Sequence, residues 1–176
     1  MGTGHIIMDE QAMQRAIARI SYEIIEHNKG AEDICIVGVL SRGVPLGRRI
    51  AAKLSELENV EVPFGELDIT PYRDDVKPDG HTEKTDIPFD IMDRNVIIVD
   101  DVIFTGRSSR AAIDALIKRG RPRSIQLAAL IDRGHRELPI RPDYVGKNLP
   151  TSHSEKVKVS VSEIDGKDSV EIFSLQ

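Results

Sequence analysis

Residues 96–108 read VIIVDDVIFTGRS, and this stretch decides the fold. Four apolar residues lead directly into two adjacent carboxylates, Asp100 and Asp101, and then into a turn that contains glycine. A continuous apolar run is typical of a parallel strand whose two faces are both covered. Residues 105–108 then open an amphipathic segment, so the stretch predicts a strand, a turn and a helix in succession. Because neighbouring like charges repel, we expect the acidic pair to face a ligand.

The pattern of strand and helix recurs on both sides of this stretch. The apolar run 34–40 precedes a helix with Pro45 in its first turn, and another apolar run covers residues 125–131. A first helix begins after Asp9, a good N-cap, and stops at Gly30. Strands that alternate with helices predict an α/β fold whose central sheet is mostly parallel, with right-handed crossovers.

The remaining segments have weaker patterns. Residues 64–70 alternate in their second half and predict a half-exposed strand. Residues 71–88 are polar and predict a long mobile loop. Residues 132–154, rich in Arg and Pro, are expected to be irregular, and two short strands at 156–161 and 170–174 are expected to close the chain.

Composition limits the class of protein. The 176 residues, 40% hydrophobic and 30% charged, fit one ordinary globular domain. The net charge of -5 argues against a uniformly basic nucleic-acid binder but leaves room for a local basic patch. Cys35 lies in an apolar run and is expected to be buried, and no Cys and His cluster predicts a protein-bound metal. Without a signal peptide or a long apolar run, we expect a cytoplasmic protein that does not bind membranes.

Polar residues follow three of the apolar strands, at 41–42, 100–101 and 132–133. Ligands of parallel sheets bind beyond the C-terminal ends of the strands. The first turn of a helix has unpaired N–H groups and a partial positive charge, so residues 105–108 suit a phosphate. Carboxylates can accept hydrogen bonds from two vicinal hydroxyls. A ribose 5-phosphate carries both the hydroxyls and the phosphate.

The stretch 96–108 resembles the 5-phosphoribosyl-1-pyrophosphate (PRPP) signature of type I phosphoribosyltransferases, from the apolar strand to the helix. This resemblance implies that the acidic pair binds the ribose 2- and 3-hydroxyls and that the turn binds the 5-phosphate. It also implies a type I phosphoribosyltransferase fold in a single domain, 1–176, with a flexible lid loop at about 71–88 and a small C-terminal hood at about 132–176. Two alternatives stay open, a capped strand end without ligand and the magnesium-binding acidic pair of a receiver-type phosphorylation domain.

Two further segments are expected to bind the diphosphate group of PRPP. Arg42 presents a planar fork that matches phosphate oxygens, and in the resembled family Ser41 and Arg42 occupy the pyrophosphate loop. Alternatively, Arg42 is a solvated residue at a helix start. Arg73 would close over the diphosphate from the lid and exclude water. Other charged residues of the lid are expected to be solvated: Asp74, Asp75, Lys77, His81 and Lys84.

The segment DRGHRELPIRPDYVGKNLPTS (132–152), with LDITPYRDD (67–75) and MDEQAMQRAIARI (8–20), resembles the PyrR family over essentially the whole chain. This resemblance implies a bifunctional protein, an RNA-binding attenuator that also has uracil phosphoribosyltransferase activity. The implied reaction converts uracil and PRPP into UMP and diphosphate, with Mg²⁺ held mainly by PRPP oxygens. Ribose C1 would become cationic as diphosphate leaves, so no residue has to act as a nucleophile.

The resemblance also implies the site residues. The expected catalytic residues are Asp100, Asp101, Arg42 and Arg73. The expected PRPP and UMP contacts are Ser41, Arg42, Asp100, Asp101, Val102, Phe104, Thr105, Gly106, Arg107, Ser108, Arg133 and Val157, of which Val157 rests on the analogy alone.

In the implied regulation, the UMP-bound protein binds a stem-loop of the pyrimidine operon leader RNA and promotes transcription termination. The basic residues expected to bind this RNA lie outside the PRPP loops: Arg15, Arg19, His135, Arg136, Arg141 and Lys147. The first helix carries Ala18, Tyr22 and His27 where family members tend to be polar or basic. A homodimer or larger oligomer is expected, because pairing would concentrate the cations. The alternatives are a scatter of surface cations and a purely metabolic uracil or purine salvage enzyme without RNA binding.

Overall fold

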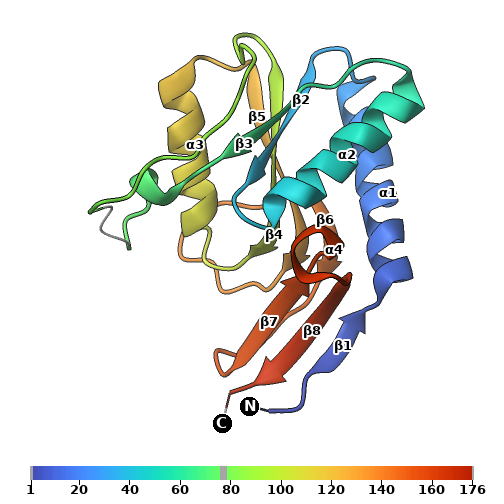
Figure 1. The fold of residues 1–176 in the computed structure, drawn as a ribbon, viewed down its shortest axis with the longest axis vertical. Helices are drawn as coiled ribbons and strands as arrows, with labels where there is room; N and C mark the ends of the chain where they lie inside the picture. Colours follow the sequence, from blue (N-terminus) through green and yellow to red (C-terminus); the bar gives the residue numbers. More distant parts are fainter. Residues whose placement is uncertain (1, 76–78, 176) are drawn as a thin grey trace.

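The computed structural model describes residues 2–75 and 79–175, which form an α/β core and a smaller hood (Figure 1). The strands are β1 His5–Met8, β2 Ile34–Val39, β3 Phe64–Leu67, β4 Asn95–Ile103, β5 Ser124–Asp132, β6 Tyr144–Asn148, β7 Glu155–Ser160 and β8 Ser169–Ser174. The helices are α1 Glu10–Asn28, α2 Gly43–Glu58, α3 Arg107–Arg119, the short α4 Ser162–Asp165 and the 3-10 helix η1 Thr70–Tyr72.

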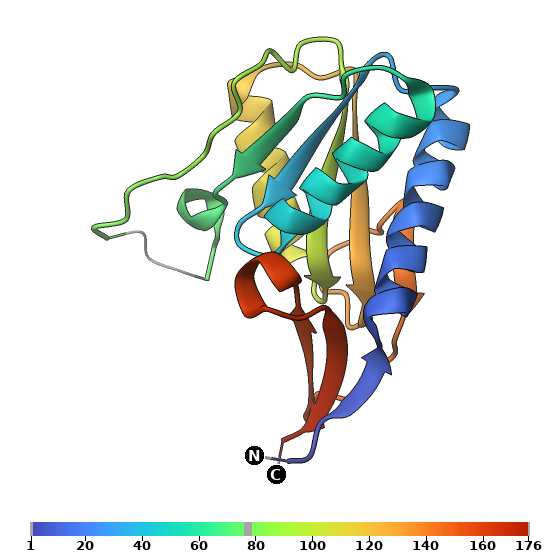
Figure 2. The same cartoon turned by 45° about the vertical axis from the view of Figure 1, so that its right-hand side comes forward.

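The predicted parallel sheet is confirmed. Within the described residues, five strands pair in the order β3-β2-β4-β5-β6, and all these pairings are parallel. Helices α1 and α2 cover one face and α3 covers the other (Figures 1 and 2). Side chains of a strand point to opposite faces in turn, so Ile97 and Val99 join the cluster under α1 and α2, whereas Val96 and Ile98 join the cluster under α3. This double cover explains why β4 reads as an unbroken apolar run.

One strand of the central sheet lies where the sequence predicted irregular structure. Strand β6 falls inside residues 132–154 and pairs in parallel with β5. It lies at an edge of the sheet, and Lys147 and Asn148 at its end are exposed. Tyr144, at its start, is buried, and its hydroxyl donates to Oε1 of Gln126 at 2.5 Å. The expectation was wrong because a short edge strand with polar residues lacks the apolar run that identifies the central strands.

The hood consists of the antiparallel sheet β1-β8-β7, the helix α4 and the segment 133–141. Strands β7 and β8 were predicted, but β1 was not, and it brings the start of the chain beside its end (Figure 1). The predicted strand at 64–70 is shorter than expected, since β3 stops at Leu67 and η1 follows. The hood is therefore built from both ends of the chain rather than from residues 132–176 alone.

The predicted helix signals are confirmed with one adjustment. Asp9 caps α1, because its Oδ1 accepts a hydrogen bond from the backbone N–H of Ala12 at 2.8 Å. The first left-handed residue after α1 is Lys29, ahead of Gly30. Cys35 is buried as expected, and burial raises the pKa of its thiol to about 12. None of the described helices is long and apolar enough to cross a membrane.

The described parts of the lid loop, residues 71–75 and 79–88, lie on the β3 side of the molecule, on the left in Figure 2. Residues 76–78, which include Lys77, lie outside the described residues. The expectation that His81 is simply solvated is wrong, because its Nε2 lies 2.6 Å from Oδ2 of Asp68, a buried carboxylate at the root of the loop. Asp68 also accepts hydrogen bonds from the backbone N–H groups of Lys84 at 3.0 Å and Thr70 at 3.1 Å. The described part of the lid is therefore anchored to Asp68.

Candidate active site

The end of β4 and the start of α2 meet at the C-terminal edge of the sheet. The acidic pair, Asp100 and Asp101, lies near the end of β4. The loop that carries Arg42 packs against it, because a Cβ on Gly43 would overlap the carbonyl oxygen of Val99 and lie 3.2 Å from Cα of Asp100. Glycine permits this approach. The preceding peptide, between Leu40 and Ser41, is cis. Two segments that the sequence separates by nearly 60 residues are thus brought together.

The acidic pair is electrostatically unfavourable. Oδ1 of Asp100 accepts the backbone N–H of Asp101 at 2.8 Å, and Oδ1 of Asp101 accepts that of Val102 at 2.8 Å. Burial, followed by the negative charge of Asp101, raises the pKa of Asp100 well above its usual value, while the positive charge of Arg73 opposes this rise. A ligand that donates hydroxyl hydrogens or brings a cation would relieve the repulsion.

The phosphate turn, residues 105–108, begins α3 as predicted. Gly106 has φ 93°, a left-handed conformation that glycine adopts without strain, and Oγ1 of Thr105 accepts the backbone N–H of Arg107 at 3.2 Å. The N–H groups in the first turn of a helix have no intrahelical partner, so such a turn suits an anion. A cavity of about 350 Å³ lies over this turn, and its lining includes Arg73, Val102, Phe104, Thr105, Gly106, Arg107 and Ser108.

The hood segment 133–141 covers the phosphate turn. The backbone N–H of Glu137 donates to the carbonyl of Thr105 at 2.9 Å. Arg136, a predicted RNA contact, is 21% exposed and donates to the carbonyl of Phe104 at 2.7 Å and to Oδ2 of Asp132 at 2.6 Å. Its guanidinium therefore holds the backbone of Phe104, the residue directly before the phosphate turn.

The start of the lid is tied to the same place. Arg73 donates to both carboxylate oxygens of Asp75, at 2.8 and 2.7 Å. Asp74 accepts from Nη1 of Arg107 at 2.5 Å. Asp74 and Asp75 are exposed, as expected of a solvated pair, but each also pairs with an arginine. Asp75 therefore occupies the edge of the Arg73 guanidinium that Nε and Nη2 form.

The hood brings a cation and aromatic rings to the other side of the site. The guanidinium of Arg133 lies 4.2 Å from the ring centre of Phe104 and donates to Oγ1 of Thr151 at 3.0 Å. Burial lowers the pKa of Arg133, and the charge of Glu155 partly opposes this. The rings of His135 and Phe104 are 5.3 Å apart. The sequence did not indicate Thr151 as a partner of Arg133. The two residues are 18 positions apart, in a segment without a recognisable helix or strand pattern.

Comparisons with known proteins identify the family. Residues 5–164 match the phosphoribosyl transferase domain. The chain is 58% identical to the bifunctional protein PyrR of Deinococcus deserti over 173 residues, which are 97% of this chain and 94% of that one. It is 55% identical to PyrR of Thermus thermophilus, over 95% and 94% of the two chains. The chain belongs to the PyrR family. Its fold also matches the crystal structure of the hypoxanthine phosphoribosyltransferase of Trypanosoma cruzi, with a TM-score of 0.75, 97% coverage of both chains and 19% identity.

The donor set of this PyrR family member fits a magnesium ion that arrives with a phosphorylated substrate. No group of three or more His, Cys, Asp or Glu in the described residues could enclose a metal on its own. Mg²⁺ usually takes one or two carboxylates and completes its shell with water and substrate phosphates. Asp100 and Asp101 are the carboxylates in the site that would serve this role.

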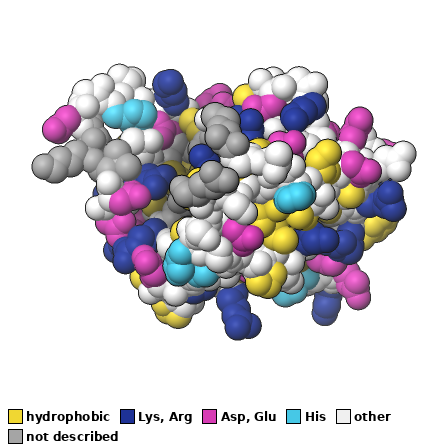
Figure 3. Space-filling model, turned by 90° about the horizontal axis from the view of Figure 1, so that it is seen from below, with side chains coloured by type: hydrophobic (Ala, Val, Ile, Leu, Met, Phe, Trp, Pro, Cys, Tyr) yellow, Lys and Arg dark blue, Asp and Glu magenta, His cyan; other side chains and the backbone are white. Residues whose placement is uncertain are grey.

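Five of the six predicted RNA contacts fall into two groups in this PyrR fold. Arg15, Arg19 and Lys147 line one surface hollow between α1, β1 and β6, and Nη2 of Arg19 donates to the carbonyl of Val145 at 3.0 Å. His135 and Arg136 instead lie beside the phosphate turn. Arg141 is exposed. Seen from the hood end, Lys and Arg side chains are interspersed with Asp and Glu, so this face carries no uniform basic surface (Figure 3).

Proposed function

We propose that this chain is a UMP-responsive RNA-binding regulator of pyrimidine operon expression that also converts uracil and PRPP into UMP and diphosphate. The observation that carries the proposal is the acidic pair beside the phosphate turn, under a hood that brings Arg133 to the site. In this arrangement Asp100 and Asp101 accept the ribose hydroxyls, and residues 105–108 hold the 5-phosphate.

The reaction needs positioning and charge neutralisation. The bond between ribose C1 and the diphosphate oxygen breaks with both electrons on oxygen, a C1–N1 bond to uracil forms, and the N1 proton is released. Arg42 and Arg73 would neutralise the leaving diphosphate. When bound with PRPP, Mg²⁺ would neutralise further charge on the phosphate oxygens. The backbone near Val157, which is half-buried in β7, would contact uracil together with Arg133.

The regulatory activity rests on the family and on the hollow that Arg15, Arg19 and Lys147 line. Salt-sensitive phosphate contacts would come from these cations and from Arg141, while loop bases and RNA shape give specificity. A homodimer or larger oligomer would place two such hollows on one assembly in the cytoplasm. Arg136 is a poor probe of RNA binding, because its loss would also disturb the phosphate turn.

The test is a panel of bases with PRPP and Mg²⁺, combined with equilibrium binding to the leader RNA of the protein's own pyrimidine operon. UMP formation from uracil and RNA binding that UMP strengthens are expected. Arg15→Gln and Lys147→Gln should weaken RNA binding and leave UMP formation unchanged. A protein that forms UMP but does not bind the RNA at moderate salt would be a uracil salvage enzyme, and turnover of hypoxanthine or guanine would make it a purine enzyme.

A further inference from the structure

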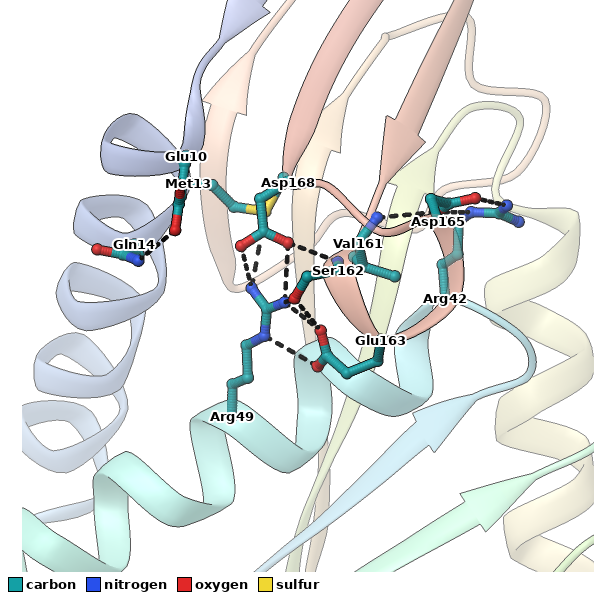
Figure 4. A network of polar contacts seen from close by, with 10 residues as sticks. All are labelled: Glu10, Met13, Gln14, Arg42, Arg49, Val161, Ser162, Glu163, Asp165 and Asp168. Atoms are coloured by element: carbon teal, nitrogen blue, oxygen red, sulfur yellow. Dashed lines mark hydrogen bonds and ion pairs between the residues drawn. The ribbon is translucent and has the colours of Figure 1, made fainter.

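Arg42 of the diphosphate loop is held by the hood. Its Nε and Nη2 donate to the two carboxylate oxygens of Asp165, at 3.2 and 2.8 Å (Figure 4). Asp165 ends α4 and lies 123 residues further along the chain. Its carboxylate also accepts the backbone N–H of Val161 at 2.8 Å, so the carboxylate is fixed against its own backbone.

A second arginine fixes α4 to the same helix. Arg49 lies seven residues after Arg42, about two turns along α2 and therefore on the same face. It donates to both carboxylate oxygens of Asp168 at 2.9 Å and to Oε2 of Glu163 at 3.0 Å (Figure 4). The side chain of Asp168 is 7% exposed, so this contact is well shielded from water. The segment that carries Asp165 is therefore anchored before it reaches Arg42.

The geometry leaves one edge of the Arg42 guanidinium for a ligand. A guanidinium has five N–H groups in a planar fork, and Asp165 takes the edge formed by Nε and Nη2. In the described residues, no hydrogen bond joins Nη1 to another group. The hydrogen bond to Asp165 raises the pKa of Arg42, and the same bond lowers the pKa of Asp165. The pair therefore stays ionised at neutral pH.

We propose that Asp165 is a positioning residue for diphosphate binding: it holds one edge of Arg42 so that the Nη1 edge faces the diphosphate. This inference rests on the proposed function, in which Arg42 binds the diphosphate. Without Asp165, the long Arg42 side chain would have to be ordered by the ligand itself. Ordering such a side chain costs enough binding free energy to weaken affinity about threefold to tenfold.

The test compares two ligands of the same site. In Asp165→Asn, affinity for inorganic diphosphate and KM for PRPP should worsen about threefold to tenfold, while affinity for UMP, which has no diphosphate, stays unchanged. Asp165→Glu retains a carboxylate and should recover most of the loss. Glu163→Gln, a change of the same kind on the same short helix, leaves the Arg42 pair intact and should not change diphosphate affinity.

A double-mutant cycle with Arg42→Gln separates positioning from general stability. If Asp165 acts through Arg42, Asp165→Asn should have no further effect on diphosphate binding in the Arg42→Gln background. Tighter diphosphate binding in Asp165→Asn, or an equal loss for UMP and diphosphate, would overturn the inference. If Asp165→Asn does not fold, Asp165→Ala takes its place in the same cycle, and its effect on diphosphate binding should likewise vanish in the Arg42→Gln background. A parent protein that binds neither diphosphate nor PRPP would instead overturn the proposed function.

Discussion

Carboxylates on the two sides of the proposed diphosphate site have pKa values shifted in opposite directions. On the sheet side, burial and the neighbouring Asp101 raise the pKa of Asp100. On the hood side, burial would raise the pKa of Asp168, but hydrogen bonds from Arg49 and the backbone of Ser162 outweigh it and lower the pKa. The acidic pair thus costs folding free energy and is available to a ligand, whereas the hood carboxylates stabilise the fold. The same chemical group therefore destabilises the fold at Asp100 and stabilises it at Asp168.

The largest expected effect is at Asp100. Asp100→Asn should lower kcat/KM for PRPP about 100-fold, because a charged hydrogen bond to the ribose is lost. The same change should raise the free energy of unfolding at pH 7. A carboxyl whose pKa is raised by folding binds more protons in the folded state, so stability falls as pH rises above about 4. Urea unfolding at pH 5 and pH 8 and steady-state kinetics measure both effects.

A matched control is Asp114→Asn, an exposed carboxylate on α3 that should change neither quantity measurably. Unchanged turnover in Asp100→Asn would show that Asp100 does not bind the ribose. A lower free energy of unfolding at pH 8 would show that the ionised Asp100 does not destabilise the fold.

Asp168 tests the hood side. Asp168→Asn should destabilise the protein by about 2 to 3 kcal/mol, because the partly buried guanidinium of Arg49 loses one of its two carboxylate partners, the buried one. The effect should shrink as pH falls below about 4, since Asp168 is protonated there in the unfolded chain. Thermal or urea unfolding measures it, and a stability gain like that of Asp100→Asn would break the contrast between the two sides.

Asp68, just before the lid loop, is another buried carboxylate that stabilises the fold. Burial would raise its pKa, but hydrogen bonds from His81 and from the backbone of Lys84 and Thr70 outweigh it and lower the pKa to about 2. The ionised carboxylate should therefore contribute about 2 kcal/mol above pH 4, which is lost as pH falls through 2. Asp68→Asn should remove this acid-dependent part of the unfolding curve, and an unchanged pH profile would refute the assignment.

The smallest effect is expected where the pair is exposed. Asp74 and Arg107 are each about 40% exposed, so Asp74→Asn should change stability by less than about 1 kcal/mol. Added salt should reduce even this difference. Unfolding at two salt concentrations checks it, and a large salt-independent loss would show that the lid is held as firmly as the hood.

The sequence by itself determined the core and the sheet side of the site. An apolar run such as 96–99 has one stable environment, a strand covered on both faces, and the residues that follow it must lie at the ligand-binding edge. Helix caps such as Asp9 act within three residues, so they too were predicted.

Only the tertiary structure decided the hood side. Strand β1 has four residues, β6 is an edge strand with polar residues, and the Asp165 partner of Arg42 lies 123 residues away. A sequence pattern reports interactions between near neighbours, because a period of two or of 3.6 residues reflects local backbone geometry. Which arginine meets which carboxylate depends instead on how distant elements pack, and that is why the diphosphate loop and the hood were predicted separately but their connection was not.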